Sequence, residues 1–240
     1  MPHTLFISDL HLSADHPHSM AAFQRFIATQ APQAEALYIL GDLFEYWAGD
    51  DDSHDPFHAQ VITALRGLAL YGTKIYVMHG NRDLLIGDEF AQAAHATLLD
   101  DPTLLDLYGT PTLISHGDTL CTDDVEYQQF RAQVHDATFQ KNFLAQPLAA
   151  RKAYIEQLRS HSMTAKQSKD SAIMDVNDEA VGALLRKHRY PRLIHGHTHR
   201  PKRHEHNVDG HSCERWVLSD WDQQASALRC DAQGCKTINC

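Results

Sequence analysis

The stretch RLIHGHTHRP, residues 192–201, opens with a short apolar run and continues with histidines at positions 195, 197 and 199. Four earlier apolar runs share its character: TLFIS (4–8), ALYIL (36–40), KIYVM (74–78) and TLIS (112–115). Short runs of this kind are typical of strands buried on both faces of a parallel sheet. Between several of them, apolar residues recur at helical spacing, as at Val61, Leu65 and Leu68. This alternation predicts a layered α/β domain.

Composition narrows the class of protein. The chain has 240 residues, 43% of them hydrophobic, which is enough to bury one sizeable core. Its formal net charge of -10 opposes binding of nucleic acid and of anionic lipid over the surface as a whole. No window approaches the roughly 18 to 20 continuous apolar residues of a membrane-spanning helix, and the start MPHTLFISDLH does not have the pattern of a signal peptide. We therefore expect a cytosolic protein without a nucleic-acid partner, and surface attachment to a membrane stays open.

The cysteines suggest no covalent framework. The chain has five of them, Cys121, Cys213, Cys230, Cys235 and Cys240, and no CxxC pair. Their odd number and wide spacing disfavour a disulfide framework and a structural zinc site. We expect Cys230, Cys235 and Cys240 to be reduced thiols.

Residues 123–170 contain helical periods and no strand, with Pro147 as a break. We interpret this segment as a helical insertion, or lid, above the functional site. The chain then divides into a core of residues 1–122 and 171–240 and an insertion of residues 123–170. Farther on, RWVLSDW (215–221) and SALRC (226–230) are typical of antiparallel strands, which predicts a mixed sheet or two stacked sheets.

Metal-ligand residue types follow each apolar run. They are Asp9, His11, Asp42, Asn81, His116, His195 and His197. In α/β sheets the carboxyl ends of the strands converge, so these side chains are expected to meet. Carboxylate, amide oxygen and imidazole together suit ions such as Mn²⁺, Fe²⁺ or Zn²⁺. The set is too large for one tetrahedral ion but suits two ions roughly 3.5–4 Å apart, with Asp42 as the bridging candidate.

The ordered series D-x-H, GD, GN, HGD and GHTH, from Asp9 to His199, resembles the calcineurin-like metallophosphoesterase superfamily. The resemblance implies a four-layered α/β/β/α metallophosphoesterase sandwich that holds two divalent metal ions. One ion would be bound by Asp9, His11, Asp42 and His197, and the other by Asp42, Asn81, His116 and His195. His199 ends the motif, and a structural role for it is at least as compatible with the pattern as metal contact.

The third motif reads GNRD, with Arg82 where the superfamily usually has the histidine of G-N-H-[DE]. That histidine is expected to protonate a leaving alkoxide. A phosphate that leaves from a pyrophosphate is already a weak base and needs little protonation. Arginine instead offers a fixed fork for phosphate oxygens. Arg82 therefore favours cleavage of a P–O–P bond over ordinary phosphomonoester hydrolysis.

Longer stretches look like the UDP-2,3-diacylglucosamine diphosphatases of lipid A biosynthesis, namely LYILGDLFEYWAGDDD, HGNRDLLIG, HGDTLCTDD, SKDSAIMDVN and LIHGHTHRP. The resemblance implies that water attacks the α-phosphorus of UDP-2,3-diacylglucosamine to give the sugar 1-phosphate (lipid X) and UMP, with Mn²⁺ as the metal. Catalytic roles would fall on Asp42, Asn81, Arg82 and His116. Substrate contacts would involve Asn81, Arg82, Asp124, Ser162, Lys166, Lys169 and His197, with Lys166 standing where the family usually has asparagine.

A diacylated substrate needs an apolar channel, and the insertion carries an aromatic stripe at Phe130, Phe139 and Phe143. Basic residues at 151, 152 and 159 favour contact with a membrane surface. We therefore expect a peripheral location on the cytoplasmic face of the inner membrane, with no obligate protein partner. The alternative is that the stripe is ordinary helix packing.

Two other functions stay open. A nucleotide phosphodiesterase would share the metal site without needing an apolar groove. A scaffold that kept the fold and lost the chemistry is the non-enzyme alternative, and the full set of expected ligand residues disfavours it.

Overall fold

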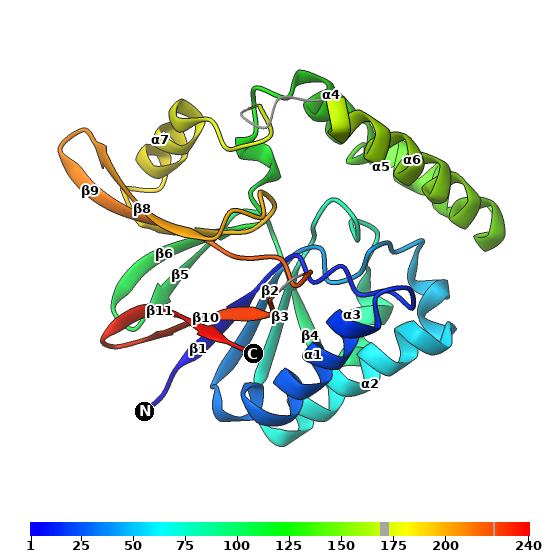
Figure 1. Ribbon diagram of the computed structural model, residues 1–240, viewed down its shortest axis with the longest axis horizontal. Helices are drawn as coiled ribbons and strands as arrows, with labels where there is room; N and C mark the ends of the chain where they lie inside the picture. Colours follow the sequence, from blue (N-terminus) through cyan, green and yellow to red (C-terminus); the bar gives the residue numbers. More distant parts are fainter. Residues whose placement is uncertain (169–172, 223) are drawn as a thin grey trace.

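Two mixed β-sheets form the centre of the computed structural model, which describes residues 1–168, 173–222 and 224–240, with the backbone alone for 160–168 (Figure 1). The first sheet contains β1 (Thr4–Ile7), β2 (Ala36–Leu40), β3 (Lys74–Met78), β4 (Ala96–Leu99), β10 (Ser226–Asp231) and β11 (Gly234–Asn239). Its order is β11-β10-β1-β2-β3-β4, with β1 to β4 parallel and β10 antiparallel to both β1 and β11.

The second sheet contains β5 (Thr103–Leu107), β6 (Thr110–Ser115), β7 (Arg192–His195), β8 (Lys202–Val208) and β9 (His211–Val217), in the order β5-β6-β7-β9-β8. β7 is parallel to both β6 and β9, whereas the edge strands β5 and β8 are antiparallel to their neighbours. All five apolar runs of the sequence are therefore strands, with bounds that differ by at most two residues at either end.

Alternation along each strand separates two apolar cores. On β1, Leu5 faces a core shared with the helices, while Phe6 packs with Ile114 and Ile194 of the second sheet. Successive side chains of a strand point to opposite faces, and here both faces are buried, which explains the nearly continuous apolar runs. Burial of each such side chain contributes roughly 1.5–3 kcal/mol.

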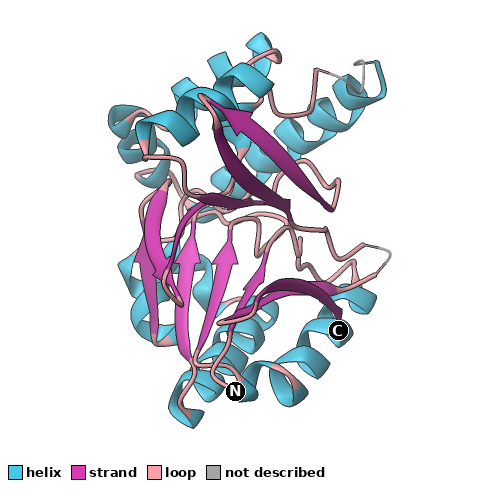
Figure 2. Cartoon of the chain, turned by 90° about the vertical axis from the view of Figure 1, so that its left-hand side faces the viewer, coloured by secondary structure: helices cyan, strands magenta, loops and turns pink. Residues whose placement is uncertain are grey.

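Helices cover the outer faces of both sheets (Figure 2). The first sheet is covered by α1 (Pro17–Thr29), α2 (Pro56–Tyr71) and α3 (Asp88–Ala94), and the second by α7 (Asp178–Lys187). α2 begins where the Asp55 side chain accepts from the Phe57 N–H, and it ends at Gly72, whose φ of 123° suits only glycine. The layers follow the order α/β/β/α, which confirms the predicted sandwich.

Three helices occupy the segment that was expected to be helical: α4 (Val125–Val134), α5 (Ala137–Leu144) and α6 (Leu148–Ser168). Asp124 and Asp136 cap the first two through their side chains, and Pro147 separates the last two. Figure 1 shows α5 and α6 above the loops at the carboxyl ends of the first sheet. Short 3-10 turns connect other elements, at η1 (Ala31–Gln33), η2 (Asp50–His54) and η3 (Asp118–Leu120).

The acidic run at 49–52 anchors this insertion. Arg151, on α6, is only 2% exposed, and it donates to the carbonyl oxygen of Ala48 and to the carboxylate of Asp51. The ammonium of Lys152 lies 2.6 Å from Oδ1 of Asp52, which is also buried. These contacts give the basic residues of α6 a packing role within the protein.

The two C-terminal strands that the sequence suggested lie in different sheets. β9 and β10 do not pair with each other, because β9 belongs to the second sheet and β10 to the first. The edge strands β8 and β11 were not anticipated. Much of each strand is exposed and carries polar residues, so neither strand has a continuous apolar run. Of the two arrangements that the sequence left open, a mixed sheet or two stacked sheets, the structure has the second, and each sheet is itself mixed.

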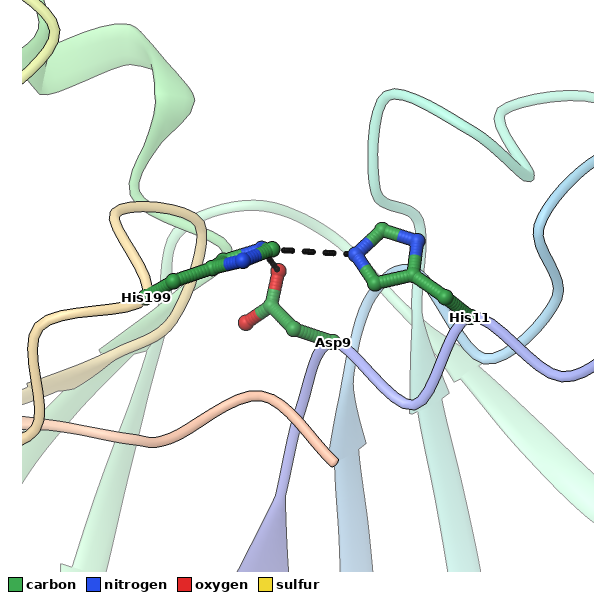
Figure 3. Close-up of side chains that lie close together, drawn as sticks. All are labelled: Asp9, His11 and His199. Atoms are coloured by element: carbon green, nitrogen blue, oxygen red, sulfur yellow. Dashed lines mark hydrogen bonds and ion pairs between the residues drawn. The ribbon is translucent and has the colours of Figure 1, made fainter. Parts of the chain in front are cut away.

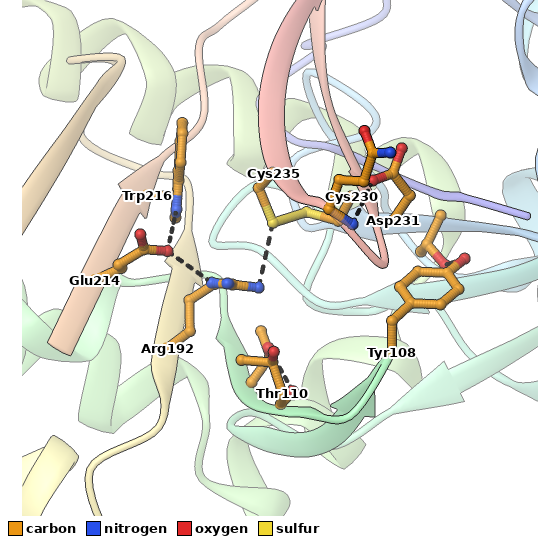
Figure 4. Close-up of a disulfide and its surroundings, with 11 residues drawn as sticks. Tyr108, Thr110, Arg192, Glu214, Trp216, Cys230, Asp231 and Cys235 are labelled. Atoms are coloured by element: carbon orange, nitrogen blue, oxygen red, sulfur yellow. Dashed lines mark hydrogen bonds and ion pairs between the residues drawn. A yellow bond between two sulfur atoms is a disulfide. The ribbon is translucent and has the colours of Figure 1, made fainter. Parts of the chain in front are cut away.

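The expectation that Cys230 and Cys235 are reduced thiols is wrong. The two residues form a disulfide between β10 and β11 (Figure 4). They occupy directly paired positions of the hairpin, with a Cα–Cα distance of 4.1 Å, and sequence spacing alone did not reveal this pairing. Nη1 of Arg192 lies 3.4 Å from Sγ of Cys235. Cys121, Cys213 and Cys240 are free thiols, which agrees with the expectation for Cys240.

Candidate active site

The polar residues that follow the strands meet above the carboxyl ends of the two sheets. Asp9 and His11 follow β1, Asp42 follows β2, Asn81 follows β3, His116 follows β6, and His197 and His199 follow β7. Five of them, Asp9, His11, Asp42, His197 and His199, have φ between 47° and 69°. Non-glycine residues in this left-handed region cost about 1–3 kcal/mol each and persist where the surrounding structure holds them. Half of the ten non-glycine residues with positive φ in the described part of the chain are thus residues with metal-ligand chemistry.

Two overlapping clusters offer ligand atoms to a metal. Those of Asp9, His11 and His199 all lie within 4.8 Å of one another (Figure 3), as do those of Asp9, Asp42 and His116. Nε2 of His199 lies 3.3 Å from Oδ1 of Asp9 and 3.3 Å from Nε2 of His11. Asp9 is therefore common to the two clusters.

Asp42, a member of the second cluster, also approaches His11 of the first. Its Oδ2 is 3.8 Å from Nε2 of His11 and 3.9 Å from Nε2 of His116. Oδ1 of Asn81 lies 3.2 Å from Nε2 of His116 and 3.0 Å from Nδ1 of His197. The imidazoles of His116 and His197 thus face one amide oxygen, and one oxygen of Asp42 lies within 3.9 Å of a histidine from each cluster.

His195 does not join either cluster. Its side chain is fully buried, Nδ1 lies 2.9 Å from the carbonyl oxygen of Gly196, and Nε2 lies 3.1 Å from Nη1 of Arg215. Both ring nitrogens are therefore engaged, and the neighbouring guanidinium repels a metal cation. His195 was expected beside Asn81 and His116, but it is His197 that faces Asn81 there, while His199 lies in the first cluster with Asp9 and His11.

A cavity of about 540 Å³ opens from the clusters toward the insertion. Part of its lining is polar and includes Asn81, Arg82 and His197, with the ring of Tyr127 5.5 Å from that of His197. The insertion adds aromatic and aliphatic side chains, namely Phe130, Val134, Phe139, Phe143, Tyr154, Ile155 and Leu158. The site therefore joins a polar, carboxylate-rich centre to an apolar chamber.

A family model for the calcineurin-like phosphoesterases matches residues 2–201. The chain belongs to this family. The resemblance that the sequence motifs suggested is thus confirmed.

Three relatives with the name UDP-2,3-diacylglucosamine hydrolase match nearly the whole chain. The relative from Aromatoleum aromaticum is 56% identical and the match covers 96% of this chain and 94% of the relative. The relative from Xanthomonas axonopodis is 49% identical, with 96% of each chain covered. The relative from Escherichia coli O7:K1 is 48% identical, with 98% of each covered. The closer resemblance to these hydrolases is confirmed as well.

Electrostatics in this family member favour cations at the clusters. Burial opposes ionisation of Asp9, but the neighbouring His199, His116 and His11 outweigh it and hold its pKa well below the usual range. Burial likewise opposes the charged form of His116, yet the carboxylates of Asp42, Asp9 and Asp118 raise its pKa to about 9. Burial also opposes the charged form of His199, but Asp220 and Asp9 outweigh it and raise the pKa of His199 to about 10. The carboxylates create a negative potential that protons or metal ions can neutralise.

The pKa values of two other histidines are lowered. Burial, together with the charge of His116, lowers the pKa of His197 to about 3. Burial also lowers the pKa of His195 to about 4, with a further contribution from Arg215. A neutral imidazole has a free electron pair for a metal or a hydrogen bond, so His197 is ready to act as a ligand.

The ligand atoms of the two clusters suit a divalent metal ion. Oδ1 of Asp9 is inaccessible to solvent, and the group that faces it is Nε2 of His199 at 3.3 Å. A buried carboxylate oxygen is costly unless a cation or a donor faces it, and in this cluster a metal ion can take the place of the His199 proton. Carboxylates, an amide oxygen and imidazoles are the ligand types of Mn²⁺, Fe²⁺ and Zn²⁺. The residues present therefore fit divalent metals.

Sequence reasoning missed three acidic residues that support the site. The Asp83 carboxylate is fully buried and accepts from the backbone of both the β2 and β3 loops. Oε2 of Glu45 lies 3.1 Å from Nδ1 of His11, and Oδ2 of Asp220 lies 2.9 Å from Nδ1 of His199. Asp83 and Glu45 stand within quoted motifs, but only their contacts show that they orient ligand residues.

The structure describes the surroundings of only some of the residues that are expected to contact substrate. Arg82 lines the cavity, and its Nη1 lies 3.9 Å from Oε1 of Glu45. Asp124 lines the cavity from the N-terminus of α4, where it accepts from the Tyr127 N–H. Ser162 and Lys166 lie on α6 beyond the last described side chain, and Lys169 is outside the described residues. Among the helices described, none has both the length and the apolar content to cross a membrane.

Proposed function

We propose that the protein hydrolyses the pyrophosphate bond of UDP-2,3-diacylglucosamine, giving 2,3-diacylglucosamine 1-phosphate (lipid X) and UMP. The observation that carries this proposal is the cavity of about 540 Å³ that joins the carboxylate and histidine clusters to an apolar chamber. A nucleotide diphosphate linked to a diacylated sugar has the same division into an anionic part and two apolar chains. The names of the curated relatives support the same substrate.

We propose that two divalent ions, Mn²⁺ by preference, occupy the clusters. Asp9, His11, Asp42 and His199 would hold one ion, and Asp42, Asn81, His116 and His197 the other. This set replaces the expected His195 with His199, in keeping with the contacts of both residues. When bound, such ions supply Lewis acidity toward phosphoryl oxygens and lower the pKa of water.

The chain's own residues contribute binding and orientation. Arg82 lines the cavity and can donate to the phosphate that leaves, because its fork matches phosphoryl oxygens. That phosphate is a weak base, so no general acid is required at position 82. Glu45 keeps the guanidinium near the site and contacts His11 as well, which couples substrate binding to the ligand shell.

We also propose that residues 123–170 form a lid that binds the acyl chains. The lid exposes Val125, Leu144 and Tyr154, with exposed fractions of 60%, 41% and 39%, and Tyr154 also lines the chamber. Apolar residues exposed near the entrance of a lipid site favour contact with a membrane surface. A peripheral position on the inner membrane would let the substrate enter without leaving the bilayer completely.

The experiment is hydrolysis of UDP-2,3-diacylglucosamine in ¹⁸O-water with added Mn²⁺, with bis(p-nitrophenyl) phosphate as a parallel substrate. Heavy oxygen in UMP is the expected result, because water then attacks the α-phosphorus. Heavy oxygen in the sugar 1-phosphate would contradict the proposed attack. Cleavage of the generic diester alone would support the nucleotide phosphodiesterase alternative.

A further inference from the structure

The first histidine of HGHTH has contacts that the metal chemistry does not use. His195 is fully buried, with Nε2 3.1 Å from Nη1 of Arg215 and Nδ1 2.9 Å from the carbonyl oxygen of Gly196. A guanidinium has only donors, so Nε2 accepts and the ring proton stays on Nδ1. Nδ1 then donates to the Gly196 carbonyl. Arg215 thus selects the tautomer of His195.

The peptide that receives this hydrogen bond also contacts Asp9. The Gly196 carbonyl and the His197 N–H belong to one planar peptide unit, and the N–H donates to Oδ2 of Asp9 at 2.9 Å. Ser8 donates its hydroxyl to the same oxygen. Oδ2 is therefore fully engaged, which leaves Oδ1 of Asp9 facing His199 and the metal cluster.

Packing leaves little freedom at this peptide. A Cβ on residue 196 would lie 2.3 Å from Oδ2 of Asp9 and 1.9 Å from Oγ of Ser8, so only glycine fits. The missing side chain lets the backbone approach the carboxylate, but it also makes the backbone more flexible. The Gly196 carbonyl also accepts from the Thr198 N–H at 2.8 Å, and the hydrogen bond from His195, which Arg215 holds in place, adds a second restraint on the plane of the peptide.

Arg215 is an unusual buried cation. It lies on β9 with 4% exposure, and the hydrogen bonds recorded for it within the described residues go to two imidazoles, His195 and His206. Buried guanidinium groups are normally paired with carboxylates, because burial of an unpaired charge is costly. The arrangement is a poor way to stabilise the fold but an effective way to orient an imidazole.

We propose that Arg215 and His195 are positioning residues that fix the Gly196–His197 peptide and thereby aim Asp9 and His197 at the metals. This inference rests on the metal site of the proposed function. The relay runs from β9 through β7 to the loop after β1, so it crosses from the second sheet to the first.

The test is the Mn²⁺ affinity of metal-stripped protein, measured by electron paramagnetic resonance of free Mn²⁺ without substrate. Arg215→Met is expected to weaken binding by about 10- to 100-fold, the usual effect of removing a group that orients a metal ligand. Arg192→Met is the matched control, because Arg192 lies in the same sheet and pairs with Glu214 at 2.9 Å, away from the cluster. The control should bind Mn²⁺ as the wild type does.

Two substitutions at His195 separate positioning from other roles. His195→Asn keeps a donor near the place of Nδ1 and is expected to retain most of the affinity, whereas His195→Leu removes the donor and is expected to lose it. A purely structural role would make the two variants equally poor. Thermal unfolding of all variants identifies any that fail to fold, and Arg215→Lys, which keeps the charge, supplies a second comparison at that position with an intermediate affinity expected.

Equal affinity of Arg215→Met and the wild type, or tighter binding by the variant, would overturn the proposal, since loss of a nearby cation would then only favour the metal. Failure of the proposed function has a different signature. Wild-type protein that binds Mn²⁺ but does not cleave UDP-2,3-diacylglucosamine would refute the substrate, while the affinities of the variants would still decide the positioning role.

Discussion

Oδ2 of Asp83 accepts a hydrogen bond from the Leu43 N–H at 2.7 Å, although 40 positions separate the two residues. The other oxygen accepts from the N–H groups of Gly80 and Asp42. One buried carboxylate therefore ties together the two loops that supply Asp42 and Asn81. The two clusters of candidate ligand residues depend on this link between neighbouring strands of the first sheet.

Asp83→Asn should weaken both the fold and the metal site. An amide has one acceptor oxygen, so its NH₂ group would face backbone donors, at a cost of about 3 kcal/mol in the free energy of unfolding. Urea denaturation measures this loss, and Mn²⁺ affinity should fall with it. Asp106→Asn is the control, because Asp106 accepts from the Gly109 N–H in an exposed turn. Equal stability of the two variants would show that Asp83 does not tie the loops.

Arg82→Lys should lower kcat/KM for UDP-2,3-diacylglucosamine by roughly tenfold, because a point charge replaces a fork and about 1.5 kcal/mol of hydrogen bonding is lost. Steady-state kinetics at saturating Mn²⁺ provide the measurement. Arg66→Lys, at an exposed position of α2, should leave the kinetics unchanged. Unaltered kinetics in Arg82→Lys would exclude a bidentate contact with phosphate.

Phe130→Ala should affect only acylated substrate. The ring lines the apolar chamber and is 38% exposed, so its removal should raise KM for UDP-2,3-diacylglucosamine by about tenfold, from roughly 1.5 kcal/mol of lost apolar contact. Hydrolysis of bis(p-nitrophenyl) phosphate should not change. Leu70→Ala, at a 71% exposed site on α2, is the control. A parallel loss for both substrates would mean that the chamber serves general folding.

Arg151→Met should loosen the insertion. The buried guanidinium bridges α6 to Ala48 and Asp51, and its loss leaves a buried carbonyl without a donor, at a cost of about 2 kcal/mol. Hydrogen exchange should then accelerate in α5 and α6, with little change in the two sheets. Lys141→Met, at an exposed position of α5, serves as the comparison. Unchanged hydrogen exchange in Arg151→Met would show that Arg151 does not hold the insertion in place.

Thiol counting tests the disulfide. Unfolded protein without reductant should react with three thiols, Cys121, Cys213 and Cys240, and after reduction with all five. In the folded protein, burial raises the pKa of Cys121 and of Cys240 to about 12, so both should react slowly. Five reactive thiols without reductant would show that Cys230 and Cys235 are not bonded. Closing so short a loop should stabilise the fold by about 2 kcal/mol.

Much of the fold could be predicted from local pattern. The five apolar runs became strands because burial on both faces requires continuous apolar sequence, and that requirement is visible without any tertiary contact. The edge strands β8 and β11 escaped prediction because their exposed faces carry polar residues, as at Lys202 and Lys236. Only pairing with a neighbour identifies such strands.

The sequence by itself determined which chemical groups the site contains, since the motifs follow strands whose ends must converge. It could not show which of the three histidines of HGHTH join the clusters, because all three are the same residue type at alternate positions. Tertiary structure made that choice: β9 brings Arg215 against His195, whereas Asp9 and Asp220 face His199. The disulfide and the role of Asp83 were decided in the same way, by neighbours that come together only when distant strands pair.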